Sequence, residues 1–114
     1  MYRILVAFWG AVRDVFPEAW GLPPTASRLM HAAGIEAMGT LMDRIMSRSG
    51  GNADPRRAAQ EALARIAPHC RWTSGRWPDI GKEWNEIQAV HRDIRLLADL
   101  LVRLDHTNTF ARVA

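Results

Sequence analysis

Hydrophobic side chains recur along most of this chain with the three-to-four-residue spacing of an amphipathic helix. Residues 2–16 carry the first such pattern, which ends at Phe16 because Pro17 disfavours helical geometry in the residue before it. The next residues are turn-like, and we expect Trp20 to anchor them by packing. The apolar positions that share one face of the first predicted helix are Ile4, Phe8, Val12 and Val15.

Residues 27–47 carry the longest helical pattern, with Thr25 or Ser27 as a candidate N-cap. Two glycines interrupt this pattern, Gly34 and Gly39. Each costs roughly 1 kcal/mol relative to alanine inside a helix. They therefore indicate either the close approach of a neighbouring element or a break in the helix near Gly34.

Two further helices are predicted in the second half of the chain. Asp54 and Pro55 mark the start of the third helix, as cap and first helical residue, and Pro68 marks its end. The last helix is expected to start at His91 or Arg92. The residues after Leu104 turn polar, so 106–114 is expected to be a flexible tail. The apolar face of the last helix comprises Ile94, Leu97, Leu101 and Leu104.

The segment between these helices is a tryptophan-rich loop from His69 to about Gly81, followed by a short helix over 84–88. No segment favours a β-strand, because the apolar runs fit the helical period better. We therefore predict an all-α fold, an orthogonal bundle of four to five helices with a Trp-rich loop. A chain of 114 residues fits a single domain, which we place over 1–105.

The charge and the cysteine content give only weak evidence on the partners and the location of the protein. The formal net charge is +3, and Lys82 is the only lysine among the fifteen basic residues. Positive charge spread along a chain is weak evidence for nucleic-acid binding. Cys70 is the only cysteine, so no internal disulfide can form and a cytoplasmic location is expected. The apolar run before Arg13 is too short to span a bilayer, so no membrane association is expected.

The reactive side chains show no pattern of a metal or catalytic site. The histidines and Cys70 lack the usual spacing of zinc ligands, so no metal or other cofactor is expected. Cys70 is interpreted as a buried, inert thiol. Glu83 and Glu86 share a helix face and could act as an acid–base pair. Solvated carboxylates in a first helical turn explain them more simply, so no catalytic residue is assigned and a small enzyme stays a reserve hypothesis.

The Trp-rich loop is the one candidate for nucleic-acid contact. Arg71 and Arg76 alternate with Trp72 and Trp77, as in basic loops whose aromatic rings stack on bases. The alternative is that the indoles fill the core beneath a long loop and the arginines pack over them. Five tryptophans in so small a domain favour that alternative.

Three segments together resemble a known family. They are FWGAVRDVFPEAW (8–20), SRLMHAAGIEAMGTLMDRI (27–45) and WTSGRWPDIGKEWNEIQAVHRDIRLLADLLVRL (72–104). They resemble the C-terminal helical part of the DGQHR-domain family, which includes DndB-type proteins of bacterial DNA phosphorothioation systems. The matching positions are Phe16-Pro17 with Trp20; Gly34-Ile35 with Ala37-Met38; Trp72, Gly75 and Trp77; Trp84-Asn85 with Gln88; and Asp93-Ile94-Arg95-Leu96-Leu97. The asparagine expected after Gln88 is Ala89.

The resemblance implies a role in DNA modification, its regulation or phage defence. The Asp-Gly-Gln-His-Arg signature of the family's upstream, ParB-like part is absent, so the chain is expected to correspond to the C-terminal portion, either a genuine short protein or a truncated gene. The first hypothesis is a non-catalytic helical module that contacts DNA through Arg71, Trp72, Arg76 and Trp77. The alternative is a protein–protein interaction module, whose partner is an upstream ParB-like domain or a second copy. It would use the apolar face of the first helix, formed by Ile4, Phe8, Val12 and Val15.

Overall fold

The computed structural model describes residues 2–48 and 54–110. Within these ranges the chain is mostly helical, which confirms the predicted class, while the orthogonal crossing of the helices stays a prediction. The α-helices are α1 (Tyr2–Val15), α2 (Ala32–Arg48), α3 (Pro55–Ile66) and α4 (His91–Phe110). Single 3-10 turns cover Arg28–Met30, Ala67–His69 and Trp84–Glu86, and two short strands are β1 (Arg76–Trp77) and β2 (Lys82–Glu83).

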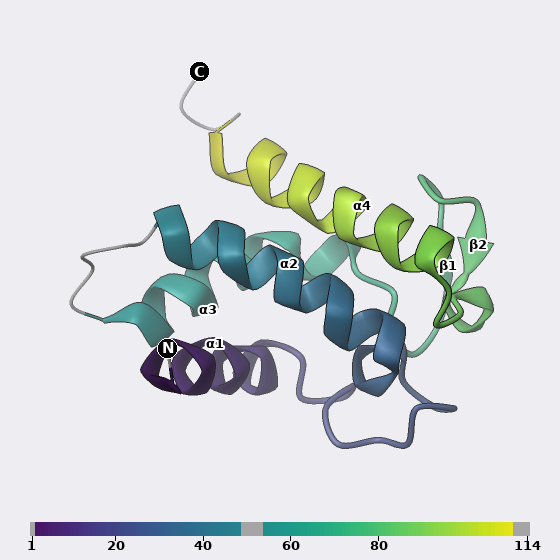
Figure 1. The fold of residues 1–114 in the computed structure, drawn as a ribbon, viewed down its shortest axis with the longest axis horizontal. Coiled ribbons are helices and arrows are strands. Elements are labelled where there is room, and N and C mark those ends of the chain that lie inside the picture. The colour runs from purple at the N-terminus through teal and green to yellow at the C-terminus, as the bar shows by residue number, and fades with distance from the viewer. Residues whose placement is uncertain (1, 49–53, 111–114) are drawn as a thin grey trace.

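The four helices pack in two pairs around one core. Helix α1 packs mainly on α3, α2 packs mainly on α4, and α3 also contacts α4 (Figure 1). Each helix buries an apolar stripe against the others, as expected of amphipathic helices. Fully buried members of this core are Phe8, Val12, Leu41, Ile45, Leu63, Ile66, Leu97 and Leu101.

The start of α2 differs from the prediction, because the first turn of the expected helix is a separate 3-10 turn. Ser27 makes no capping bond through its side chain, and the chain is extended at His31. The imidazole of His31 instead accepts a hydrogen bond from the backbone N–H of Ala33 at 3.1 Å. Close packing accompanies the break, because a Cβ at Gly34 would overlap the backbone carbonyl oxygen of Arg28. The predicted close approach is therefore confirmed at Gly34, but not at Gly39, where a Cβ would meet nothing within 4 Å.

The start of α3 agrees with the prediction. The Asp54 carboxylate accepts a hydrogen bond from the backbone N–H of Arg57 at 3.1 Å, and Pro55 is the first helical residue. The cap satisfies one of the N–H groups that a helix leaves unpaired at its start.

Arg28 is buried and joins three segments that are distant in sequence. Its guanidinium donates hydrogen bonds to the backbone carbonyls of Pro24 (2.9 Å), Asn85 (2.7 Å) and Ile87 (2.8 Å). Its backbone N–H donates to the carbonyl of Trp72 at 2.9 Å. The linker after α1, the start of the Trp-rich loop and the segment that follows this loop are therefore fixed at one point, which we call the Arg28 junction.

The Trp-rich loop contains a small antiparallel sheet, so the expectation of no strand was wrong. Arg76 pairs with Glu83 and Trp77 with Lys82. Gly75 and Gly81 adopt φ values of 86° and 77°, which only glycine reaches without strain, and they immediately precede β1 and β2 respectively. Two paired residues in each strand give too short an alternation for a sequence pattern to reveal.

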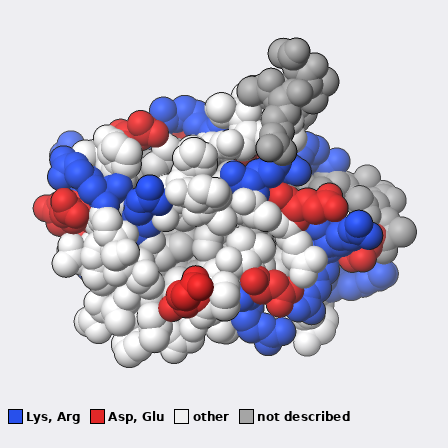
Figure 2. Space-filling model, turned by 180° about the vertical axis from the view of Figure 1, so that it is seen from behind, with Lys and Arg blue, Asp and Glu red and all other residues white. Residues whose placement is uncertain are grey.

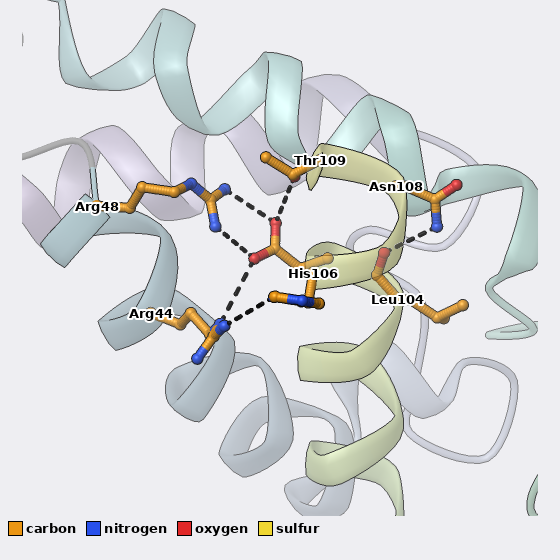
Figure 3. Close-up of polar contacts among 7 residues, drawn as sticks. Arg44, Arg48, Leu104, His106, Asn108 and Thr109 are labelled. Atoms are coloured by element: carbon orange, nitrogen blue, oxygen red, sulfur yellow. Dashed lines mark hydrogen bonds and ion pairs between the residues drawn. The ribbon is translucent and has the colours of Figure 1, made fainter. Parts of the chain in front are cut away.

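Helix α4 continues to Phe110, so the predicted tail is wrong for residues 106–110, and 111–114 lie outside the described residues. The polar sequence there has a structural role, because Asp105 is fully buried. Its carboxylate accepts two hydrogen bonds from Arg48 of α2, at 2.6 and 2.9 Å, and lies 3.9 Å from Arg44. Figure 3 shows both arginines reaching from α2 to the end of α4. This ion pair holds the last turns of α4 on α2.

The two glycines of α2 give a matched test of the Arg28 junction. Gly34→Ala is expected to lower the free energy of unfolding by at least about 2 kcal/mol, because the new methyl group would displace backbone. Gly39→Ala meets nothing within 4 Å and is expected to raise it, by up to about 1 kcal/mol. Urea unfolding followed by tryptophan fluorescence measures both, and equal effects of the two substitutions would contradict the close approach.

Candidate functional site

The indoles of the Trp-rich loop are buried. Trp72 is 4% exposed and Trp77 is 1% exposed. Their rings meet edge to face with centroids 5.3 Å apart, and Phe16 packs on Trp72 in the same manner at 6.2 Å. The two rings therefore fill the core beneath the loop, as the alternative interpretation held. The prediction that they stack on bases does not fit this burial, because stacking needs an accessible ring face.

The two arginines of this loop bond to the loop itself. Arg71 donates to the carbonyls of Pro68 at 2.8 Å and Cys70 at 2.9 Å. Arg76 donates to the carbonyl of Gly81 at 3.1 Å, and its guanidinium lies 3.6 Å from the Glu83 carboxylate. Arg71 therefore stabilises the start of the loop and Arg76 the turn between the strands, where Arg76 is also paired with a carboxylate. They do not form a free basic patch.

Acidic and basic side chains are also mixed over the surface of the molecule. Figure 2 shows acidic and basic side chains interspersed around a broad uncharged area on the face that it displays. The electrostatic footprint of a nucleic-acid-binding protein is instead a clustered basic patch or stripe.

Glu83 and Glu86 form a helix cap. The Glu86 carboxylate accepts a hydrogen bond from the backbone N–H of Glu83 at 2.7 Å, and the Glu83 carboxylate accepts one from the backbone N–H of Glu86. This reciprocal arrangement is a capping box, which satisfies N–H groups at the start of the 3-10 turn Trp84–Glu86. The arrangement accounts for the spacing of the pair without an acid–base role.

Cysteine and histidine form no reactive centre in the described ranges. Burial raises the pKa of the Cys70 thiol to about 12, against the opposing effect of the Arg71 charge. The thiolate is the nucleophilic form, so this thiol is unreactive at neutral pH. Among residues 2–48 and 54–110, no three His, Cys, Asp or Glu side chains gather closely enough to hold a metal ion.

The predicted interface on the first helix is divided between the core and the surface. Phe8 and Val12 are fully buried inside this chain, Val15 is partly buried, and Ile4 is 39% exposed. Phe8 and Val12 therefore cannot serve a partner while the chain is folded. The inner side of α1 is the side that packs on α3 and the core.

The outer side of α1 is also apolar and is left exposed. Tyr2 is 81% exposed and Val6 is 52% exposed, and Leu5 and the partly buried Trp9 extend the same surface. A hollow of about 330 Å³ lies beside Tyr2 and Val6 at the start of α3. A second hollow of about 200 Å³ lies beside Val6, Trp9 and Trp20.

Arg56 of α3 separates the two hollows and lines both. Its guanidinium rests on Gly10 of α1, where a Cβ would come within 3.2 Å of it. It donates to the Asp14 carboxylate at 2.7 Å, and Gln60 donates to the same oxygen at 2.7 Å. These bonds from Arg56 and Gln60 lower the pKa of Asp14 below its usual value.

The outer stripe of α1 was missed in the sequence because only one apolar face was expected. The signal was present, since Tyr2, Ile4, Leu5, Val6, Phe8 and Trp9 are more apolar residues than one helix face accommodates. Comparison with known proteins adds no candidate residue, because no family model, curated protein or solved structure matches this chain. Every helix within 2–48 and 54–110 is too short or too polar to traverse a lipid bilayer.

Asp93, at the start of α4, makes the stability of the loop depend on pH. Its buried carboxylate accepts hydrogen bonds from Lys82 at 3.0 and 3.2 Å and from the backbone N–H of Gln88 at 2.9 Å. Burial by itself would raise the pKa of Asp93, but the bonds from Gln88 and Lys82 lower it below the ordinary 3.8. A lowered pKa in the folded state adds stability above the unfolded-state value, and that stability is lost as pH falls through the folded-state value.

We therefore expect Asp93→Asn to lower the free energy of unfolding at neutral pH by about 1 kcal/mol. Between about pH 5 and pH 2, the variant should lose less stability than the wild type, because the titrating group is gone. Asp99→Asn, at an exposed position of the same helix, is the control. Urea unfolding across this pH range measures the difference, and parallel curves for wild type and Asp93→Asn would contradict the assignment.

Proposed function

We propose that this chain is a non-catalytic helical module that assembles with another protein through the outer face of α1. The observation that supports the proposal is that α1 is apolar on two sides, while the rest of the chain covers only one. A helix that is apolar all round is normally buried on all sides.

Exposed apolar side chains are concentrated at this place. Among the described residues, the large hydrophobic side chains that are exposed outside α1 are Leu22, Ile35, Val90 and Leu96, which lie in three separate parts of the chain. The other four lie within the first five residues of α1: Tyr2, Leu5 and Val6 lie outside the core-facing stripe, and Ile4 is the exposed end of that stripe. Single exposed hydrophobic residues need no explanation, whereas a contiguous apolar patch beside a hollow is typical of an interaction site.

The resemblance to the DGQHR-domain family suggests a setting for this assembly. A ParB-like domain of such a protein would be a natural partner for the outer face of α1, and the complex would act in DNA modification, its regulation or phage defence. A cytoplasmic location is consistent with the single cysteine. Direct DNA contact through Arg71, Trp72, Arg76 and Trp77 has less support, because the indoles are buried and the arginines bond to their own loop.

An apolar patch without its partner is expected to associate weakly with itself at high concentration. Sedimentation velocity in high salt, where repulsion between like charges is screened, should therefore show concentration-dependent association of the wild type. Val6→Glu should remain monomeric, since it places a charge in the patch. Val90→Glu, at a position that is also 52% exposed but lies outside α1, should associate like the wild type.

The outcome that contradicts the proposal is a wild-type chain that stays monomeric at all concentrations and salts and behaves like Val6→Glu. Association that Val90→Glu abolishes and Val6→Glu preserves would also contradict it, because the adhesive surface would then lie elsewhere. Circular dichroism establishes that each variant is folded before its association is measured.

A further inference from the structure

The outer face of α1 is shaped as a groove with a regular period. Tyr2, Val6, Trp9 and Arg13 follow one another at intervals of four, three and four residues and so lie on one side of the helix. We call this stripe, together with Trp20 and Arg56 beside it, the α1 groove. The two hollows described above share Val6 and Arg56, so they lie next to each other along α1.

The dimensions of the α1 groove fit a helix. At 1.5 Å per residue, the distance along α1 from Tyr2 to Arg13 is about 17 Å, which equals roughly three turns. A partner helix of that length would present apolar side chains at every third or fourth position, one set for each hollow. Binding of an amphipathic helix in an apolar groove is a recurrent mode of peptide recognition.

The charges around the α1 groove are mostly positive. Arg3 lies at one end, Arg13 at the other, and Arg56 between them. Arg56 is neutralised by Asp14, but Arg3 and Arg13 are exposed, and neither has a carboxylate within 4 Å among the described residues. Among the described residues that line the hollows, Asp54 is the one acidic residue, and its carboxylate caps α3. The groove therefore combines an apolar floor with a positive charge at each end.

This charge pattern discriminates between the possible occupants. Suppose that α1 of a second copy packed along the groove. Antiparallel helices would bring Arg3 of one copy close to Arg13 of the other, and parallel helices would bring each arginine close to the same arginine of the other copy. Like charges placed together at an interface are unfavourable, so a second copy is a poor occupant. A nucleic-acid backbone would neutralise the arginines but would leave the apolar floor uncovered. A helix with both apolar and acidic side chains would cover the apolar floor of the groove and also neutralise the arginines at its two ends.

We infer that the α1 groove receives an amphipathic helix of about three turns whose apolar stripe is flanked by Asp or Glu side chains. The inference rests on the proposed assembly function and specifies the chemistry of the partner. The apolar side chains would enter the two hollows, and the acidic side chains would pair with Arg3 and Arg13.

The test uses a synthetic helical peptide of about 14 residues, with leucines at every third or fourth position and glutamates beside them. A fluorescent label on the peptide allows binding to the full chain to be measured by anisotropy. The expected dissociation constant is in the micromolar range, and it should rise about tenfold or more in the double variant Arg3→Glu/Arg13→Glu. Binding should weaken with added salt, the opposite of the salt response expected for self-association.

Two controls make the result specific. Arg95→Glu/Arg103→Glu changes the net charge by the same amount at exposed positions of α4, and it should bind like the wild type. A second peptide, with lysine in place of every glutamate, should not bind. Val6→Glu should abolish binding of the acidic peptide, since its charge would lie on the floor of the groove.

Three outcomes would overturn the inference. Equal binding of the lysine peptide, or unchanged binding by Arg3→Glu/Arg13→Glu, would show that charge does not select the partner, while the assembly function of the face would stand. If the acidic peptide does not bind a chain that does self-associate through Val6, the inferred partner chemistry is wrong, while the assembly function of the face would stand. Binding of a DNA duplex that depends on Arg3 and Arg13, without binding of the peptide, would assign these arginines to nucleic acid instead.

Discussion

The buried guanidinium of Arg28 holds together two connecting segments, the linker after α1 and the chain between α3 and α4. Its hydrogen bonds to the carbonyls of Pro24, Asn85 and Ile87 connect the linker after α1 to the end of the Trp-rich loop. No carboxylate lies within 4 Å of it in the described residues, so backbone dipoles and the Trp84 ring, 5.9 Å from the Arg28 Cζ atom, surround the charge. A buried charge is expensive unless it is well hydrogen-bonded, so these carbonyls have little freedom to move. The Arg28 junction thereby fixes the loop in which Trp72 and Trp77 complete the core.

That constraint explains why the sequence predicted the helices better than the connections. The starts of α3 and α4 follow from local signals, the Asp54-Pro55 pair and the helical spacing of apolar residues that begins at Ile94. The 3-10 turn before α2 places the Arg28 carbonyl against Gly34, a local contact that helical periodicity does not reveal. The last turns of α4 depend on the pairing of Asp105 with Arg48, 57 residues away in sequence. Polar residues that become buried through distant partners look like a solvated tail when only their own segment is considered.

At the candidate site, too, the local sequence left two structural interpretations open. The alternation of arginine and tryptophan in the loop was compatible with base stacking and with core packing, and only burial distinguishes the two. On α1, periodicity correctly grouped Phe8 with Val12, but it could not decide whether that face meets this chain or a partner. A helix with apolar residues on both sides has no preferred orientation by periodicity alone. Contact with α3 decides it, and Tyr2 and Val6 are left exposed with the partly buried Trp9 beside them.

The central claim is that one side of α1 serves folding and the other side is free for a partner. Val12→Asn and Val6→Asn test it most directly, because they make the same change at a buried and at an exposed position of one helix, and valine and asparagine have similar helix propensities. In urea unfolding, Val12→Asn should lose about 3 kcal/mol through burial of an amide, and Val6→Asn should stay within about 0.5 kcal/mol of the wild type. A loss at Val6 as large as that at Val12 would contradict the account, because the outer stripe would then belong to the fold.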